Sequence, residues 1–230
     1  MLKLINGDGK MKDTKQMSET FLLGVLLAIT GGFLDAYTYM SRGHVFANAQ
    51  TGNMVLLGMN IAEGNFREAV YYIIPIVAFI VGIIISEMVK KRYKAKKAIH
   101  WRQIVIIVEV VVLIIVANIP DGRWNMVANI LVSLVCSMQV QSFRKFNGNA
   151  FATTMCTGNL RSGTEQMIRY IQTKDRLILE RSMQYYAIIL FFIIGAGMGV
   201  LLTNMLGTYS VLSCCMILMV VFGIMFIKNE

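Results

Sequence analysis

The tripeptide Thr-Gly-Asn occurs twice in this chain, at residues 51–53 and again at residues 157–159. Each copy follows a short polar run that lies beside a long apolar stretch. Glycine frees the backbone, and Thr or Asn side chains accept hydrogen bonds from unpaired N–H groups at the start of a helix. That end of a helix is also the positive end of its dipole and attracts polar or anionic groups. The two copies predict paired binding segments. The alternative is that glycine only allows close packing and Asn only caps a helix.

Two carboxyl groups lie inside apolar stretches, Asp35 within 21–40 and Glu109 within 103–118. An ionisable side chain inside a membrane span is a functional-site hypothesis by default, because burying a charge in lipid is costly. We expect both groups to be candidates for proton coupling, since desolvation can keep a buried carboxyl group protonated. The structural alternatives are an ion pair between Asp35 and Arg42, and a hydrogen bond from Glu109 to another span.

The predicted binding set joins the two triplets to polar residues on the apolar stretches before them. Asp35 precedes Thr51 by 16 residues and Gln139 precedes Thr157 by 18, so both hold similar places in their halves. Such a set suits a neutral polar or anionic solute, although Asp35 leaves cation transport open. The set comprises Asp35, Thr51, Gly52, Asn53, Gln139, Thr157, Gly158 and Asn159, with Asn48, Gln50 and Gln141 as further neutral hydrogen-bonding groups.

Membrane helices must position these residues. Hydrophobic residues make up 56% of the 230-residue chain and the mean hydropathy is +0.60, which is too apolar for a soluble domain. The long apolar stretches approach the roughly twenty residues that a helix needs to cross a bilayer. We therefore predict an all-α polytopic membrane protein. Its spans are predicted at about 21–40, 69–89, 103–118, 124–142, 184–203 and 208–227.

The six predicted spans fall into two halves with the same order. In each half a span is followed by a triplet region and two further spans, which gives repeat one at 21–118 and repeat two at 124–227. Residues 21–230 form a single membrane domain in this interpretation, and residues 1–20 form a polar, disordered cytoplasmic tail. The stretch 161–181 is predicted to be a charged helix that is too polar to cross the membrane.

Two topologies fit this order: eight spans with parallel repeats, or six spans with inverted repeats. In the second, each triplet region is a re-entrant hairpin or a broken helix. With both termini in the cytoplasm, the six-span arrangement leaves only Arg42, Arg67 and Arg123 of the 22 Lys and Arg residues outside. Because basic residues collect on the cytoplasmic side, we favour six spans with inverted repeats. The two hairpins would then meet near the middle of the membrane.

The net charge of +9 has a similar explanation. Seven basic residues and no acid lie within 90–102, directly between two predicted spans. This segment predicts a cytoplasmic loop in contact with anionic lipid rather than a nucleic-acid partner. The four cysteines lack CxxC spacing and the chain has two histidines, so we expect no metal site and no cofactor. The motifs of common hydrolases, metalloproteases and phosphate-binding loops do not occur, so an enzyme is not expected.

Several of these segments resemble the YoaK family of bacterial integral membrane proteins, which is classed as a domain of unknown function. The residues that carry the resemblance are Gly-Phe-Leu-Asp-Ala at 32–36, FANAQTGNMVLLG at 46–58 and Thr-Gly-Asn at 157–159. It extends over about 20–227 and departs at 136–139, where Cys-Ser-Met-Gln stands in place of a Gly-x-Gln pattern. The resemblance implies a helical fold in the bacterial inner membrane and supplies no substrate.

Two functions of different classes fit these observations. The first is a small-solute permease or channel with a midplane site formed by the two opposed hairpins. The second is a non-transporting scaffold or partner-binding subunit. In that case small-residue faces at 24–32 and 195–199 associate within the chain or with another protein, as in a homo-oligomer. The identity of the solute is not predicted from the sequence.

Overall fold

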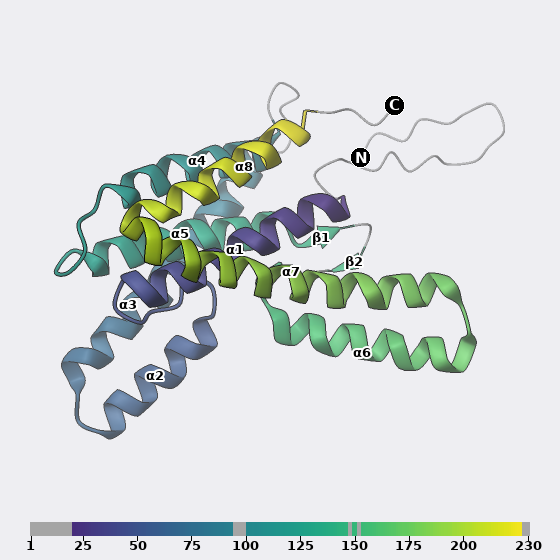
Figure 1. The fold of residues 1–230 in the computed structure, drawn as a ribbon, viewed down its shortest axis with the longest axis horizontal. Coiled ribbons are helices and arrows are strands. Elements are labelled where there is room, and N and C mark those ends of the chain that lie inside the picture. Colours follow the sequence, from purple (N-terminus) through teal and green to yellow (C-terminus); the bar gives the residue numbers. More distant parts are fainter. Residues whose placement is uncertain (1–19, 94–99, 147–148, 151–152, 227–230) are drawn as a thin grey trace.

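The chain folds as a bundle of helices in a computed structural model that describes residues 20–93, 100–146, 149–150 and 153–226. Figure 1 shows the bundle, from which two helical arms project. One arm is α2 with the start of α3, and the other is α6 with the start of α7. The elements are α1 (Phe21–Ser41), α2 (Gln50–Ala62), α3 (Phe66–Tyr93), α4 (Trp101–Ala117), α5 (Asn125–Ser142), β1 (Lys145–Phe146), β2 (Asn149–Ala150), α6 (Cys156–Thr173), α7 (Arg176–Leu206), a 3₁₀ turn η2 (Gly207–Val211) and α8 (Leu212–Ile224).

The prediction of a helical protein is confirmed, with one short exception. The strands β1 and β2 pair as an antiparallel ladder of two residues each. The predicted charged helix at 161–181 is wrong in its extent, because α6 ends at Thr173. Lys174 then takes a left-handed conformation at φ 55°, and the Asp175 side chain caps α7 by accepting from the backbone N–H of Leu177 at 2.9 Å. The predicted tail at 1–20 lies outside the described residues apart from Thr20.

The two halves of the chain use the same set of helix neighbours. The helix α1 packs on α7 as α5 packs on α3, and the short helices α2 and α6 fold back on α3 and α7. The helix α4 contacts α5, α8 contacts α1, and α4 and α8 lie side by side (Figure 1). The order span, triplet helix, span, span therefore packs in the same way in both halves.

Corresponding helices of the two halves run in opposite directions. Arg42, which follows α1, bonds to the carbonyl of Val116 near the end of α4 and to Asn125 at the start of α5. Tyr37 near the end of α1 donates to the carbonyl of Thr208, in the turn between α7 and α8. The carboxyl ends of α1, α4 and α7 therefore lie at the same end of the bundle as the amino ends of α5 and α8. Thus α1 is antiparallel to α5, and α4 to α8.

Glycines allow the closest helix pairs to approach. A Cβ atom on Gly195 of α7 would collide with the carbonyl oxygen of Ile29 on α1, and one on Gly199 would lie 2.8 Å from the carbonyl oxygen of Phe33. In the other half, a Cβ on Gly82 of α3 would collide with the carbonyl of Leu134 on α5. The small-residue faces on α1 and α7 pack against each other inside the chain.

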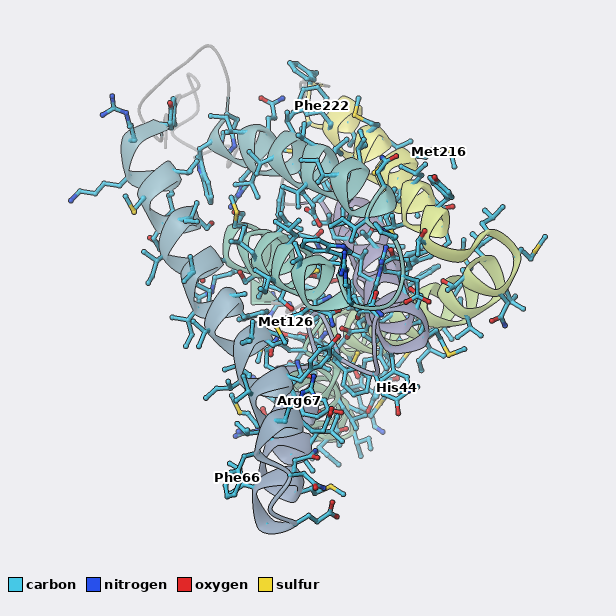
Figure 2. All side chains as sticks on the ribbon, turned by 90° about the vertical axis from the view of Figure 1, so that its left-hand side faces the viewer. His44, Phe66, Arg67, Met126, Met216 and Phe222 are labelled. Carbon is cyan, nitrogen blue, oxygen red and sulfur yellow. The ribbon has the colours of Figure 1, made fainter. Side chains whose placement is uncertain are left out.

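The outside of the bundle is apolar. Large hydrophobic side chains are exposed along α3, α4, α7 and α8, including Phe66 and Met216 at 67% exposure each (Figure 2). A soluble fold rarely leaves so many in contact with water, whereas lipid solvates them. Among the described residues, three helical stretches are long and apolar enough to cross a bilayer: Phe21–Ser41, Phe66–Tyr93 and Arg176–Ile224. Together with the resemblance noted above, this surface indicates a membrane protein.

Candidate functional site

The Asn53 side chain fixes the loop before α2. Its Nδ2 donates to the carbonyl of Phe46 at 2.8 Å and to Oε1 of Gln50 at 2.9 Å. Its Oδ1 accepts from the backbone N–H of Phe46 at 3.0 Å. Asn53 is the one buried residue of α2, because the rest of that helix is half-buried or exposed. The amide predicted to hold a solute is therefore bonded to its own loop in this structure.

Gly52 and Thr51, the other two residues of the first triplet, differ in their surroundings. Gly52 faces the Phe46 ring, which would lie 2.9 Å from a Cβ at that position. Thr51 is exposed and does not take part in the buried cluster. Glycine therefore allows close packing, as in the structural alternative stated above, whereas Asn53 bonds the loop and does not cap α2.

The loop before α2 is hydrogen-bonded to Asp35 of α1. The carboxyl group is 5% exposed, and its Oδ1 accepts from the backbone N–H groups of Asn48 at 2.6 Å and Ala49 at 3.4 Å. Ala49 is the N-cap of α2, so the Asp35 carboxyl group stands at the amino end of that helix. A carboxylate there is favourable because it faces free N–H groups and the positive end of the helix dipole.

Arg42 does not form the ion pair with Asp35 that was considered as an alternative. The buried guanidinium donates to the carbonyls of Val116 at 3.0 Å and Ile119 at 2.9 Å, and to the Tyr37 hydroxyl at 2.7 Å. Asn125 adds an acceptor at 3.3 Å. The positive charge thus sits at the carboxyl end of α4, where the helix dipole is negative. This arrangement explains how Arg42 is buried without a carboxylate partner.

The second loop reaches the same part of α1 as the first. The Thr154 side chain packs so closely on Gly31 that a Cβ on that glycine would collide with it. The Nδ2 of Asn48, from the first loop, donates to the carbonyl of Gly31 at 3.3 Å. Gly31 lies one turn before Asp35 on α1. The loops from both halves therefore meet on α1 beside Asp35.

The second triplet is arranged like the first. Asn159 is buried at 2% exposure, whereas Thr157 and Gly158 are exposed. Asn159 has interaction partners, as Asn53 does. In both halves the Asn of the triplet points inward and the Thr points outward.

Glu109 and Gln139 form a second buried contact, between α4 and α5. Glu109 is fully buried and Gln139 is 2% exposed. In one orientation of the Gln139 amide, its nitrogen lies 2.9 and 3.1 Å from the two Glu109 oxygens. In the other orientation the nitrogen lies 3.5 Å from the carbonyl oxygen of Leu27 and the amide oxygen faces Glu109. The alternative raised for Glu109, a hydrogen bond to a polar group on another span, is therefore available.

A buried thiol lies on the helix that carries Gln139. Cys136 of α5 is 1% exposed. Neither Cys136 nor Gly31 and Thr154 was among the predicted site residues. Their sequence neighbourhoods are ordinary apolar or polar runs, so only the packing of α1, α5 and the loops reveals them.

The helical bundle, its apolar surface and its buried polar centre define an integral membrane protein with several transmembrane helices. The chain belongs to the family described as "Protein of unknown function (DUF1275)", whose profile matches residues 23–224. It is 27% identical over 175 residues to the UPF0700 transmembrane protein YoaK of Bacillus subtilis (strain 168), covering 72% of this chain and 76% of that protein. No solved structure matches. The family match runs from α1 to α8 and includes the whole candidate site.

Proposed function

We propose that this protein is a small-solute permease of the bacterial inner membrane, with its site where the two loops meet on α1. The observation that carries the proposal is the convergence of the Asn48 loop, the Thr154 loop and the Asp35 carboxyl group in the bundle interior. Loops and helix ends buried at membrane depth are typical of transport sites, because irregular backbone there must be enclosed by protein or face a polar path.

The proposed topology has six spans in two inverted repeats, with both termini in the cytoplasm. It is supported by the opposite directions of α1 and α5 and of α4 and α8. The helix α2 has 13 residues, about 20 Å in length, which is too short for a hydrocarbon core of about 30 Å. The helix α6 carries Arg161, Glu165 and Arg169 and is too polar to face lipid along its length. Basic residues within 90–102 would lie at the cytoplasmic surface beside anionic lipid.

Glu109 is the proposed proton carrier. If Glu109 is protonated, its O–H can donate to the Gln139 oxygen while the Gln139 nitrogen faces the carbonyl of Leu27. If Glu109 is ionised, the amide must turn so that its nitrogen donates to the carboxylate. The two orientations of the Gln139 amide thus match the two protonation states of Glu109. A pair that fits both states without unpaired donors is suited to gaining and losing a proton.

The second candidate function is a non-transporting membrane scaffold. It is favoured by the Asn53 amide, whose donors and acceptor are already used by its own loop. In a scaffold this loop and the glycine faces would serve only to hold the helices together. The two candidates differ in whether Asp35 and Glu109 affect the movement of a solute.

The test is a flux screen in proteoliposomes with a panel of small polar solutes, with and without an imposed pH gradient. Asp35→Asn should reduce flux about tenfold or more, because it removes the charge at the site. Glu109→Gln should abolish the response to the pH gradient, because an amide keeps the shape and releases no proton. Glu165→Gln, which changes an exposed carboxylate in a surface pair with Arg161, serves as the control and should leave flux unchanged.

The scaffold function would be supported instead if no solute in the panel crosses with the wild-type protein. Equal flux in wild type, Asp35→Asn and Glu109→Gln would contradict the proposed mechanism. Size-exclusion profiles of each variant show whether a loss of flux reflects a loss of folding.

A further inference from the structure

Two oxygens at the meeting point of the loops lack a hydrogen-bond donor. Asp35 Oδ2 and Asn48 Oδ1 are both buried and without a partner in the part of the chain that the structure describes. The residues themselves are in contact, because the backbone N–H of Asn48 donates to Asp35 Oδ1. Burying such oxygens without a donor costs free energy, so a ligand that satisfies both would be held there.

The Asn48 amide is locked with its oxygen as the free end. Its Nδ2 donates to the carbonyl of Gly31 at 3.3 Å. Turning the amide over would place its oxygen against that carbonyl oxygen, which is also an acceptor. The free end of Asn48 is therefore an acceptor in the same way as the free oxygen of Asp35.

The arrangement disfavours an anion. The amino end of α2, which would attract an anion, already faces the Asp35 carboxyl group. Arg42, the buried cation of α1, is used by carbonyls at the end of α4 and by Tyr37. An anionic solute would therefore meet acceptor oxygens, whereas a cation would be attracted to them.

The charge at this point matches a single positive charge. Asp35 is the carboxyl group in contact with Asn48, whereas Glu109 contacts Gln139. A divalent ion would leave one positive charge uncompensated in the interior, which is costly. Thr153, beside the residue that packs on Gly31, has a further buried hydroxyl oxygen without a partner among the described residues.

We propose that Asp35 Oδ2 and Asn48 Oδ1 are ligands of a small monovalent cation such as Na⁺, K⁺ or ammonium. Hard cations of this kind prefer carboxylate and carbonyl oxygens. The inference rests on the proposed function in one respect: it identifies the cation as the solute or coupling ion of the permease. Binding itself does not depend on transport.

The experiment is a thermal-unfolding titration of the full-length protein in detergent at mildly alkaline pH. NaCl, KCl and NH₄Cl are each compared with N-methylglucamine chloride at constant ionic strength. At least one small cation should raise Tm saturably, whereas the large organic cation should not. No cation-specific rise in the wild-type protein would overturn the inference.

The variants test the ligands. Asp35→Asn and Asn48→Leu should each weaken apparent cation affinity about tenfold or more, because the first removes the negative charge and the second removes a ligand oxygen. The matched controls are Glu165→Gln and Asn118→Ala, which change exposed side chains and should bind as wild type. Equal cation shifts in the wild type, Asp35→Asn and Asn48→Leu would also overturn the site.

The titration tests the cation site and the flux screen tests the permease function, and either result can be negative without the other. A cation-specific shift with no flux of any solute would leave this site standing and remove the permease function. Flux without a cation-specific shift would leave the permease function standing and overturn the cation site.

Discussion

Asn53 and Arg42 each hold parts of the chain together with a single polar side chain. Asn53 closes the loop from Phe46 to Gln50 through three hydrogen bonds. Arg42 joins the end of α1 to the end of α4 and the start of α5. The proposed site at Asp35 depends on both, because Asn53 fixes the loop before α2 and Arg42 fixes the end of α1.

Asn53→Ala should destabilise the protein by about 2–3 kcal/mol, because it breaks three hydrogen bonds and leaves half-buried groups of Phe46 and Gln50 without their partner. Asn60→Ala, on the same helix, loses one bond to the carbonyl of Leu56 and should cost about 1 kcal/mol or less. Reversible unfolding in mixed micelles measures both. Equal losses in the two variants would mean that Asn53 does not fix the loop.

The sequence identified Asp35, Glu109 and the triplets as unusual, because a charge in an apolar run and a repeated tripeptide are local signals. Asp35 and the start of α2 indeed lie together. The pairing of Asp35 with Arg42, which was weighed as the structural alternative, does not form. Apart from the nearby Tyr37 hydroxyl, the acceptors of Arg42 lie more than seventy residues away in the chain, where no local spacing could indicate them. The role of Thr154 on Gly31 was missed for the same reason.

Among the helices, α1 and α7 form the contact on which the two loops depend. Gly31 of α1 lies against both Thr154 of the second loop and Phe192 of α7. The glycines of α7 differ sharply in their surroundings. A Cβ on Gly195 would collide with the backbone of Ile29, whereas one on Gly197 would have no atom within 4 Å. Gly197 is therefore a matched control position for substitutions at Gly195.

At the scale of these elements, Gly195→Leu should separate α1 from α7 and abolish a monodisperse, folded preparation, because a backbone cannot yield as a side chain can. Gly197→Leu should be tolerated within about 0.5 kcal/mol, since it adds an apolar side chain to an open surface. Fluorescence-detected size exclusion and thermal unfolding compare the two variants. A well-folded Gly195→Leu variant would contradict the described packing of α1 on α7.

Sequence pattern predicted the helices well because apolar stretches of membrane length leave few other folds. It placed the first span at 21–40, and α1 occupies Phe21–Ser41. It predicted one charged helix at 161–181, where the chain forms α6, a break at Lys174 and the beginning of α7. The left-handed residue at this break is a lysine, which carries no sequence signal comparable to glycine or proline.

For the molecule as a whole, we propose that two oppositely directed halves place their loops at one site within the membrane. The packing of α1 on α7 and of α3 on α5 brings the halves together in the same way. In the proposed topology the α2–α3 turn and the α6–α7 turn would lie on opposite sides of the bilayer. Parallel repeats would place corresponding turns on the same side.

The measurement that tests this claim most directly is the accessibility of single cysteines in intact cells and inverted vesicles, in a variant whose four native cysteines are replaced. Glu63, Lys91 and Lys174 are exposed positions, one in the α2–α3 turn, one at the end of α3 and one in the α6–α7 turn. Glu63→Cys should react with a membrane-impermeant maleimide from outside, and Lys91→Cys and Lys174→Cys only from the cytoplasmic side. Labelling of Glu63→Cys and Lys174→Cys from the same side would contradict the account.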